Sequence, residues 1–369
     1  MSSVETLRVT VVAEALWHRV PGGTGVATLE LLRGLQRRTD VDLDAVCAKR
    51  SQEAVSQSPV EVRRTRLPRV ALYEAWARSG RPDISSPETR LIHSPMLMAP
   101  TASTRPVVVT VHDLAWLRRP EDFPRRALEL YRRMWKRVSS DAAHIICSSQ
   151  TTADHATSAG ADADQVSVVY LGGRNLHSWP GSVSGSFGVR SPYILSVGTA
   201  EPRKNLGRLL AAFEASELWR DSVQLAIVGP DGWRYELAAS LDGLHPEARA
   251  HVVAVGRVGD AELGALYKHA TAFAYPSLLE GFGLPVLEAL AAGTPVLTSS
   301  TTATAETAGA AGLLVDPTSV PDIAAGLKRI VSDDELRRTL VAAAPGQAER
   351  FSWSRHLNET VAIYESVVG

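Results

Sequence analysis

Short runs of valine, isoleucine and leucine alternate with segments of helical periodicity along almost the whole chain. The apolar runs predict strands at Leu7–Ala13, Val41–Cys47, Leu91–His93, Val107–His112, His144–Ser148, Val166–Leu171, Tyr193–Gly198, Val223–Gly229, His251–Val255, Thr271–Tyr275, Pro295–Thr298 and Gly312–Val315. The periodic segments predict helices that include Gly25–Arg38, Pro124–Ser139, Leu206–Ala215, Ala261–His269, Pro285–Ala292, Val320–Val331 and Ser352–Val367. Strands that are apolar at every position are typical of parallel sheets covered on both faces. The pattern therefore predicts an α/β fold.

The length of 369 residues favours two domains, each large enough for its own core. Residues 172–191 are rich in glycine, serine and proline and lack periodicity, which predicts a linker. We therefore expect Rossmann-like domains at 1–171 and 192–351, followed by a last helical segment at 352–369. Doubly wound domains bind ligands at the carboxyl ends of their strands, so the simplest arrangement is two domains facing across a cleft that holds the active site.

Composition excludes several classes of protein. A formal net charge of −1 gives no indication of nucleic-acid binding. Cys47 and Cys147 lie in apolar runs and are expected to be buried thiols, not a disulfide. No secretory signal is recognisable, and no segment is apolar over the ~18 residues of a membrane span. We expect a cytoplasmic protein, or one peripheral on the inner face of the membrane.

The most informative stretch contains two glutamates, Glu280 and Glu288. A strand leads into a turn with two glycines, and a helix begins with Pro285 in its first turn. Such a junction suits a phosphate, because backbone N–H groups and the helix dipole face it. Carboxylates accept hydrogen bonds from hydroxyls, so the layout fits a nucleotide sugar, with ribose near Glu288 and the donor sugar near Glu280. The alternative is a plain junction with two exposed acids.

The turn after Tyr193–Gly198 carries two adjacent cations, Arg203 and Lys204. They could neutralise a diphosphate leaving group as its bond to a sugar breaks. A solvated charged loop is the structural alternative.

The first domain offers two weaker signals. A glycine-rich loop, with Gly23, Thr24 and Gly25, follows the first strand and could approach a phosphate, or be only a tight turn. His112 and Asp113 stand where a buried strand ends. His112 could bind a sugar hydroxyl or transfer a proton, and Asp113 could orient it or bind acceptor. Alternatively, the pair caps a loop; for His93, at a similar position, we favour a structural role.

Together these motifs resemble the large family of retaining glycosyltransferases called family 4, or glycosyl transferases group 1, of GT-B architecture. The motifs are Gly-Gly-x-Gly, Val-His-Asp, Val-Gly-Thr-x-Glu-Pro-Arg-Lys-Asn, Gly-Arg-Val and Glu-x7-Glu. The family's common Gly-Arg is Gly-Thr199 here, as in a branch that often makes bacterial surface polysaccharides, frequently with mannose. The resemblance also implies that the C-terminal helix crosses back to the N-terminal domain.

The resemblance implies a role for each candidate residue. Gly23, Thr24 and Gly25 would lie against the donor diphosphate; His112 would contact the donor sugar; Arg203 and Lys204 would hold the phosphates; Arg257 and Val258 would edge the nucleobase; Phe282, Gly283 and Leu284 would offer backbone N–H groups; and Glu280 and Glu288 would bind the sugar hydroxyls and the ribose diol.

The implied activity moves a hexose from a nucleoside diphosphate sugar, with GDP-mannose favoured, to an acceptor hydroxyl with retention of configuration. The acceptor would be a glycan, a lipid-linked glycan or a small molecule. No cofactor or metal is expected, since Arg203, Lys204 and the helix start could neutralise the diphosphate and no cysteine or histidine cluster has zinc spacing. The alternatives are a nucleotide-sugar epimerase or hydrolase of the same fold, and a non-catalytic nucleotide-sugar-binding subunit.

The segment Phe123–Arg137 has basic residues around an apolar stripe. A basic amphipathic helix could touch an anionic membrane that carries a lipid-linked acceptor. A helix that covers the sheet with a charged outer face is the interpretation we favour.

Overall fold

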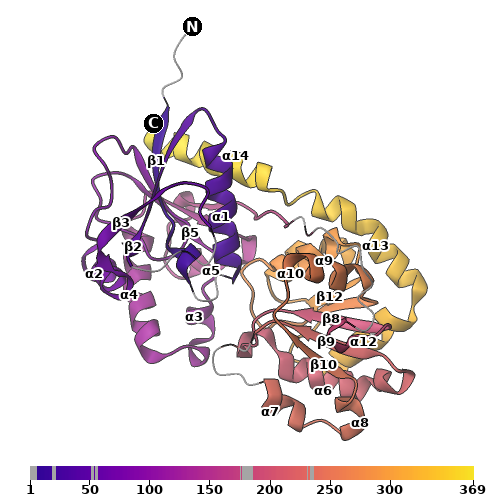
Figure 1. Ribbon diagram of the computed structural model, residues 1–369. Helices are drawn as coiled ribbons and strands as arrows, with labels where there is room; N and C mark the ends of the chain where they lie inside the picture. Colours follow the sequence, from indigo (N-terminus) through magenta and orange to yellow (C-terminus); the bar gives the residue numbers. More distant parts are fainter. Residues whose placement is uncertain are drawn as a thin grey trace. The chain divides into compact units, whose positions relative to one another are not determined.

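A computed structural model describes residues 6–18, 22–50, 54, 57–174, 176, 186–230, 232 and 237–369. The chain divides into two compact units, Met1–Gly172 with Ser352–Gly369, and Gly173–Phe351. Each unit is a parallel sheet with helices on both faces (Figure 1), so the predicted pair of doubly wound α/β domains is confirmed. The predicted linker, 172–191, lies partly outside the described residues; of its described members, Gly173 and Arg174 belong to the second unit.

The sheet of the first unit has the strand order β3-β2-β1-β4-β5-β6-β7. Its strands are β1 (Leu7–Val12), β2 (Val41–Lys49), β3 (Val62–Pro68), β4 (Leu91–Ser94), β5 (Val107–Val111), β6 (His144–Cys147) and β7 (Val166–Val168). Its helices are η1 (Glu14–Trp17), α1 (Gly22–Gln36), α2 (Arg69–Ser79), α3 (Ala115–Arg118), η2 (Pro120–Asp122), α4 (Arg125–Asp141), α5 (Gln150–Ser158), η3 (Ala163–Gln165) and α14 (Trp353–Val368).

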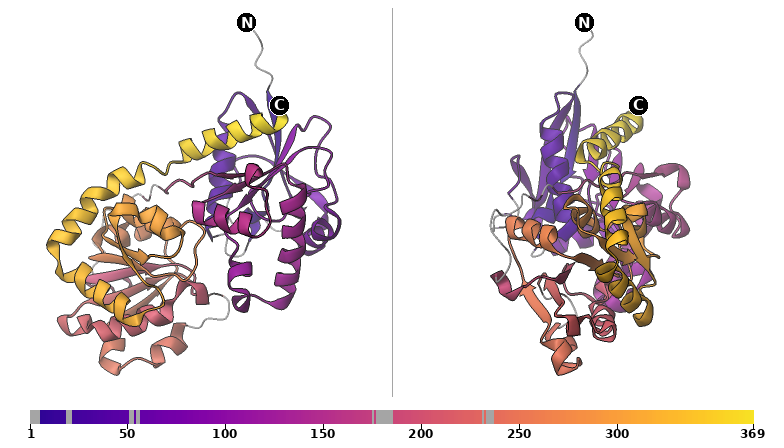
Figure 2. Two further views of the ribbon diagram at one scale, coloured as in Figure 1. Left: turned by 180° about the vertical axis from the view of Figure 1, so that it is seen from behind. Right: turned by 90° about the vertical axis from the view of Figure 1, so that its right-hand side faces the viewer.

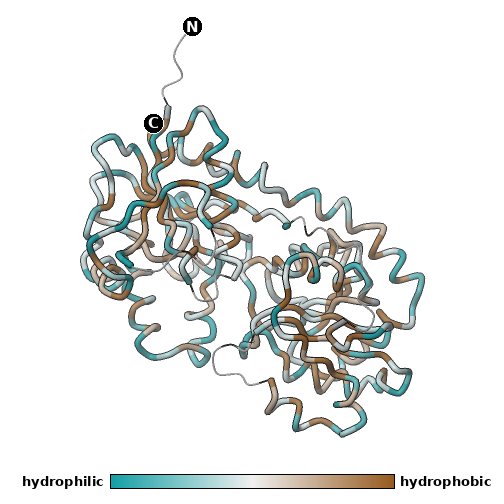
Figure 3. The backbone as a smooth tube through the Cα atoms, viewed as in Figure 1, coloured by the Kyte–Doolittle hydropathy of each residue, from teal (hydrophilic) through white to brown (hydrophobic). Residues whose placement is uncertain are grey.

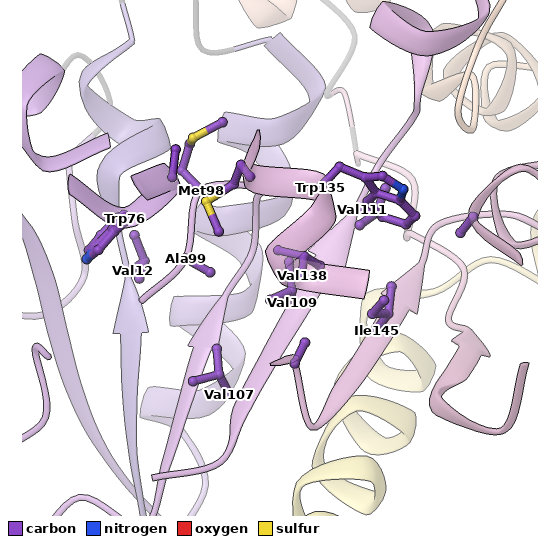
Figure 4. Packing of buried hydrophobic residues seen from close by; sticks show 14 of the residues in the cluster. Val12, Trp76, Met98, Ala99, Val107, Val109, Val111, Trp135, Val138 and Ile145 are labelled. Carbon is purple, nitrogen blue, oxygen red and sulfur yellow. The ribbon is translucent and has the colours of Figure 1, made fainter. Parts of the chain in front are cut away.

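Successive residues of the central strands enter different cores, which explains their continuously apolar sequences. Val109 packs with Trp76 and Val138 in the core on the α2 and α4 face (Figure 4). Its neighbour Val108 belongs to the other core, with residues of α1 and α14. Side chains alternate between the two faces of a strand. When helices cover both faces, every side chain of the strand is buried, and apolar residues are favoured at every position.

The C-terminal helix α14 belongs to the first unit, where it lies against α1 (Figure 2). The Tyr364 hydroxyl lies 2.6 Å from His93 Nδ1, and His356 Nδ1 lies 3.0 Å from the carbonyl oxygen of Tyr170. At Gly172 an added Cβ would lie 2.4 Å from the backbone nitrogen of Trp353, so glycine permits this close approach.

The sheet of the second unit has the order β10-β9-β8-β11-β12-β13. Its strands are β8 (Tyr193–Val197), β9 (Gln224–Val228), β10 (Val252–Gly256), β11 (Ala272–Tyr275), β12 (Val296–Ser299) and β13 (Gly312–Val315). Its helices are η4 (Ser186–Gly188), η5 (Pro202–Lys204), α6 (Leu206–Ser216), η6 (Leu218–Asp221), α7 (Leu237–Asp242), α8 (Pro246–Arg249), α9 (Asp260–His269), α10 (Leu284–Ala291), α11 (Ala303–Ala308), η7 (Gly309–Ala311), α12 (Val320–Ser332) and α13 (Asp334–Ala348).

The second unit repeats the same packing principle. Ile194 of β8 enters the core beneath α6 and α12, while its neighbour Leu195 enters the core beneath α9 and α10. Hydrophobic positions accordingly concentrate along the strands, and the helices alternate between hydrophobic and hydrophilic positions (Figure 3). The loops at the carboxyl ends of these strands carry most of the charged candidate residues.

Candidate donor-binding site

Two neighbouring strands position the charged residues of the second unit. β11 pairs directly with β8, whereas the chain after β8 continues to β9 on the other side of β8. The carboxyl ends of β8 and β11 therefore form the topological switch point at which open α/β sheets bind ligands. The loops that follow are tied together: Leu278 N–H donates to the carbonyl oxygen of Arg203 at 2.8 Å, and the Asn205 side-chain amide donates to that of Pro276 at 2.8 Å.

Glu280 and Lys204 form the centre of this site. The Lys204 ammonium lies 2.6 Å from Glu280 Oε1, and Arg203 Nη1 lies 3.3 Å from Oε2. The Tyr275 hydroxyl donates to Glu280 Oε1 at 3.0 Å and accepts a hydrogen bond from Lys204. The side chains of Lys204 and Glu280 are only 11% and 8% exposed. Arg203 Nε also pairs with Glu201 at 2.9 Å, so the sequence places a compact network of two cations and two carboxylates at the switch point.

Burial and neighbouring charges shift the pKa values of this network. Burial, and then Arg203, lower the pKa of Lys204, while Glu280 opposes this change. Burial alone would raise the pKa of Glu280, but Lys204 and Arg203 outweigh it and hold this pKa below its ordinary value. Burial raises the pKa of Tyr275, so its phenol stays protonated and remains a donor. At neutral pH the carboxylate is charged and bound to its cations.

The second glutamate has partners of its own. Glu288 lies in α10, and its side chain is 2% exposed. Arg174 Nε donates to Oε1 at 2.6 Å, and the Tyr267 hydroxyl donates to Oε2 at 3.1 Å. Arg174 Nη1 also reaches Asp260 Oδ1 at 3.1 Å. Burial raises the pKa of Glu288, and Arg174 opposes this effect.

Sequence reasoning missed Arg174, Tyr267 and Tyr275. Arg174 lies in the non-periodic segment, which offers no pattern to place it. The two tyrosines lie among apolar residues and are typical of a core. Tyr275 is the last residue of β11, so the strand-end rule that selected His112 could have found it.

The turn before α10 is fixed by close packing. Gly283 has φ 99°, and an added Cβ would lie 2.7 Å from Thr304 Cγ2. The Phe282 ring packs edge-on against Phe351 at a centroid distance of 5.4 Å, and Leu284 is buried. The first N–H groups of a helix have no partner within the helix, and the contact of these donors with a ligand stays a prediction.

Arg257 and Val258 occupy the turn between β10 and α9. Arg257 is exposed and Val258 half-buried, and β9 separates their strand from β8. Asp260 is the first residue of α9, Gly259 takes the cap position before it, and the Asp260 carboxylate binds Arg174. The contact of Arg257 and Val258 with a nucleobase stays a prediction.

The prediction of a glycine-rich loop after the first strand is wrong, because these residues are helical. Gly23, Thr24 and Gly25 form the first turn of α1, which begins at Gly22. The positive φ of Gly22, 56°, lets the chain enter the helix there, and Thr28 Oγ1 donates to the carbonyl oxygen of Thr24 at 2.8 Å. A helix start still presents backbone N–H groups, so a phosphate contact remains physically reasonable.

His112 is a half-buried neutral side chain at the end of β5. Its Nε2 lies 3.2 Å from the carbonyl oxygen of Pro95, so this nitrogen carries the proton. Its Nδ1 is buried and has no hydrogen-bond partner. Burial lowers the pKa of His112, although Asp113 opposes the shift. The arrangement leaves a neutral acceptor nitrogen suited to a hydroxyl.

Asp113 and His93 have local structural roles. Asp113 Oδ1 accepts the Ala115 N–H at 2.9 Å and so closes the turn into α3. His93 is buried, with Nδ1 2.6 Å from the Tyr364 hydroxyl and Nε2 2.8 Å from Thr110 Oγ1. Burial lowers the pKa of His93 to about 3. The structural interpretation of His93 is confirmed.

The helix α4 faces the core with its apolar stripe. Leu128, Met134, Trp135 and Val138 are buried, while Arg133 pairs with Glu74 of α2 at 2.8 Å. The apolar stripe of α4 packs into the protein's own core. Only the charged face of this helix could therefore contact a membrane.

Metal-ligand clusters and membrane-spanning helices are both missing from the described residues. In the part of the chain that the structure describes, no group of three or more histidine, cysteine or acidic side chains has the geometry of a metal site. Among the helices of these same ranges, none combines the length and apolar character needed to cross a bilayer.

The fold defines the protein as GT-B. The sucrose-phosphate synthase of Thermosynechococcus elongatus superposes with a TM-score of 0.78 at 22% identity, over 98% of this chain and 99% of that one. Family models add the sequence evidence: "Glycosyltransferase Family 4" matches residues 21–172, and "Glycosyl transferases group 1" matches residues 184–347. The chain belongs to this glycosyltransferase family.

Curated relatives are mannosyltransferases. The O-antigen chain mannosyltransferase B of Escherichia coli is 37% identical over 174 residues, which are 47% of this chain and 45% of the relative. The MMP alpha-(1->4)-mannosyltransferase of Mycolicibacterium hassiacum is 32% identical over 246 residues, which are 64% of this chain and 57% of that protein. The chain thus matches about half the length of these relatives.

Proposed function

We propose that this protein is a retaining, metal-independent hexosyltransferase that moves mannose from GDP-mannose to an acceptor hydroxyl in glycan or polysaccharide biosynthesis. The network of Lys204, Arg203 and Glu280 at the switch point of the second unit carries the proposal. The mannosyltransferase relatives support the choice of sugar. A nucleoside diphosphate needs this kind of site, with fixed positive charge beside a helix start.

The residues of this chain suit a reaction without a protein nucleophile. The acceptor oxygen would attack the anomeric carbon on the face from which the diphosphate leaves, and the acceptor proton would pass to the departing phosphate oxygen. Arg203 and Lys204 would stabilise the charge that develops on the diphosphate. Their charge takes the place of a metal ion in this proposal.

Glu280 binds both cations, so a bound donor would have to share them with this carboxylate. The Lys204 ammonium has three protons, of which two point to the Tyr275 hydroxyl and Glu280 Oε1. The third is available to a phosphate oxygen. The carboxylate keeps acceptor sites for sugar hydroxyls, and His112 Nδ1 would accept a hydrogen bond from the sugar.

A thermal-shift screen against UDP, GDP, dTDP, ADP and their common sugars tests this proposal, with Glu288→Ala as the control. A ligand at about 100 times its Kd adds about 2.7 kcal/mol of stability. Stabilisation by GDP and GDP-mannose that weakens in Glu288→Ala supports the donor site. No shift with any nucleotide at millimolar concentration would contradict it and would favour a non-catalytic or partner-dependent protein. Donor consumption without acceptor would favour the epimerase or hydrolase alternative.

A further inference from the structure

The carboxylate of Glu288 is held by a residue outside the family motifs. Arg174 precedes the first strand of the second unit, and 113 residues stand between it and Glu288 in the sequence. Arg174 Nε lies 2.6 Å from Glu288 Oε1, and Arg174 Nη1 lies 3.1 Å from Asp260 Oδ1. The guanidinium therefore bridges α10 and the start of α9. Charge-assisted bonds of this length are strong and directional.

Backbone packing fixes Arg174 in this position. At Gly173 an added Cβ would lie 3.2 Å from Leu287 Cγ, the side chain next to Glu288 in α10. The chain therefore passes directly over α10 at this point. The side chain of Arg174 is 27% exposed, which shows that it covers the carboxylate and still reaches the surface.

Glu288 needs this cation to stay ionised. Its side chain is 2% exposed, and burial raises its pKa, with Asp260 adding to the effect. Arg174 is the first of the groups that lower it, and the Tyr267 hydroxyl adds a hydrogen bond. A carboxylate has about four lone-pair sites. Arg174 and Tyr267 each occupy one site, which leaves acceptor capacity for a vicinal diol.

We propose that Arg174 is a positioning residue that holds Glu288 as an oriented anion for the ribose hydroxyls of the nucleotide. The proposal rests on the proposed donor site, in which Glu288 binds ribose. Arg174 would thereby determine how strongly the protein distinguishes a ribonucleotide from its 2′-deoxy counterpart. It would not contact the reacting atoms.

Calorimetric titration with GDP and 2′-deoxy-GDP tests the proposal, with UDP and dUDP, and ADP and dADP, as parallel pairs. The wild-type protein should prefer the ribose form roughly tenfold, since its carboxylate loses a hydroxyl partner in the deoxy form. Arg174→Gln should bring this preference close to one, as Glu288→Gln does, and the double variant should show no further loss. Arg174→Lys should restore part of the preference.

The pH profile separates positioning from general structural support. Three groups face Glu288: Arg174, Tyr267 and Asp260. Without Arg174 the pKa of Glu288 rises further, so in Arg174→Gln the preference for ribose should return as pH increases and Glu288 ionises. The wild-type preference should change little over the same range.

Arg329→Ala serves as a matched control, because it removes an exposed arginine of α12 in the same unit. Circular dichroism confirms folding of every variant, and Arg174→Lys provides a second, milder substitution. An unchanged ribose preference in folded Arg174→Gln, or an equal loss of affinity for both nucleotide forms, would overturn the positioning role of Arg174. The proposed donor site would not be affected by either result. Wild-type protein that binds none of these nucleotides at millimolar concentration would overturn the donor site itself.

Discussion

The two units present different chemistry at the carboxyl ends of their strands. In the second unit, Lys204, Arg203 and Glu280 gather as a charged network beside a helix start. In the first unit, His93 and His112 are held neutral by burial, and each accepts or donates hydrogen bonds without charge. At the ends of β4 and β5 the first unit thus presents neutral imidazoles, whereas its buried ion pair, Glu14 with Arg50, lies at the ends of β1 and β2.

This difference matches the two kinds of group in a nucleotide sugar. A diphosphate requires positive charge, and fixed cations stabilise it most where water is excluded. A sugar ring offers neutral hydroxyls, for which a neutral imidazole such as His112 is a suitable partner. The comparison predicts that Lys204 and Arg203 affect nucleotide binding, that His112 affects binding of the sugar, and that buried His93 affects the stability of the first unit.

Removal of Glu280 should have the largest effect. Glu280→Ala leaves the buried Lys204 ammonium without its carboxylate partner, whereas Arg203 keeps Glu201, and breaking a buried pair typically destabilises by about 3–5 kcal/mol. Urea unfolding of the second unit measures this change. A nucleoside diphosphate should restore more stability to Glu280→Ala than to wild type, because it supplies the missing negative charge.

Glu349→Ala is the matched control, since it removes an exposed glutamate at the end of α13. A loss of stability in Glu280→Ala no larger than in Glu349→Ala would show that the network does not hold the second unit together.

Mild acid should lower the free energy of unfolding of the first unit, which is the next largest effect. The pKa of His93 is about 3 in the folded protein, below the ordinary value of 6.5, because of burial. The unfolded chain therefore binds the proton first, and stability is lost as pH falls below about 6.5. At pH 5 the loss is about 2 kcal/mol for this histidine. Chemical denaturation at pH 7 and pH 5, followed by signals of the first unit, measures it.

His356 of α14 should act in the same direction, since burial lowers its pKa to about 4. Exposed His269 in the second unit provides the matched control: His269→Gln should leave the stability of the first unit unchanged. A first unit equally stable at pH 7 and pH 5 would contradict the assignment of buried neutral histidines.

Tyr275→Phe should act on catalysis with little loss of stability, and it would sharpen the comparison. The ring stays stacked on Phe273 at a centroid distance of 5.6 Å, but the hydroxyl bonds to Lys204 and Glu280 are lost. A hydrogen bond to a charged group contributes about 1.5–3 kcal/mol, so kcat/KM should fall roughly 10- to 150-fold. Steady-state transfer kinetics measure it, and unchanged kinetics would show that the hydroxyl does not position the pair.

Much of the fold could be predicted from local pattern. The continuously apolar strands identified both sheets, and β11 was predicted to within one residue. The strand β3 was not predicted, because its sequence, Val62–Pro68, carries three arginines and is not continuously apolar. Charged residues are typical of an edge strand exposed to water. The start of α1 was misplaced because glycines usually indicate a loop, whereas Gly22 here begins the helix.

The partners of the site residues could not be predicted. The strand-end rule selected Lys204 and Glu280 as candidates, but their ion pair depends on which strands are neighbours, and β8 and β11 are far apart in sequence. Arg174 reaches Glu288 only through the packing of Gly173 on α10. Long-range contacts of this kind leave no periodic signal.

The most direct test of the division between the units is calorimetric titration of GDP and GDP-mannose into Lys204→Gln and His112→Asn. Lys204→Gln should lose affinity for both ligands, whereas His112→Asn should keep its affinity for GDP and lose affinity only for GDP-mannose. Equal affinity of Lys204→Gln and wild type for GDP, or an equal loss of GDP binding in both variants, would contradict this division.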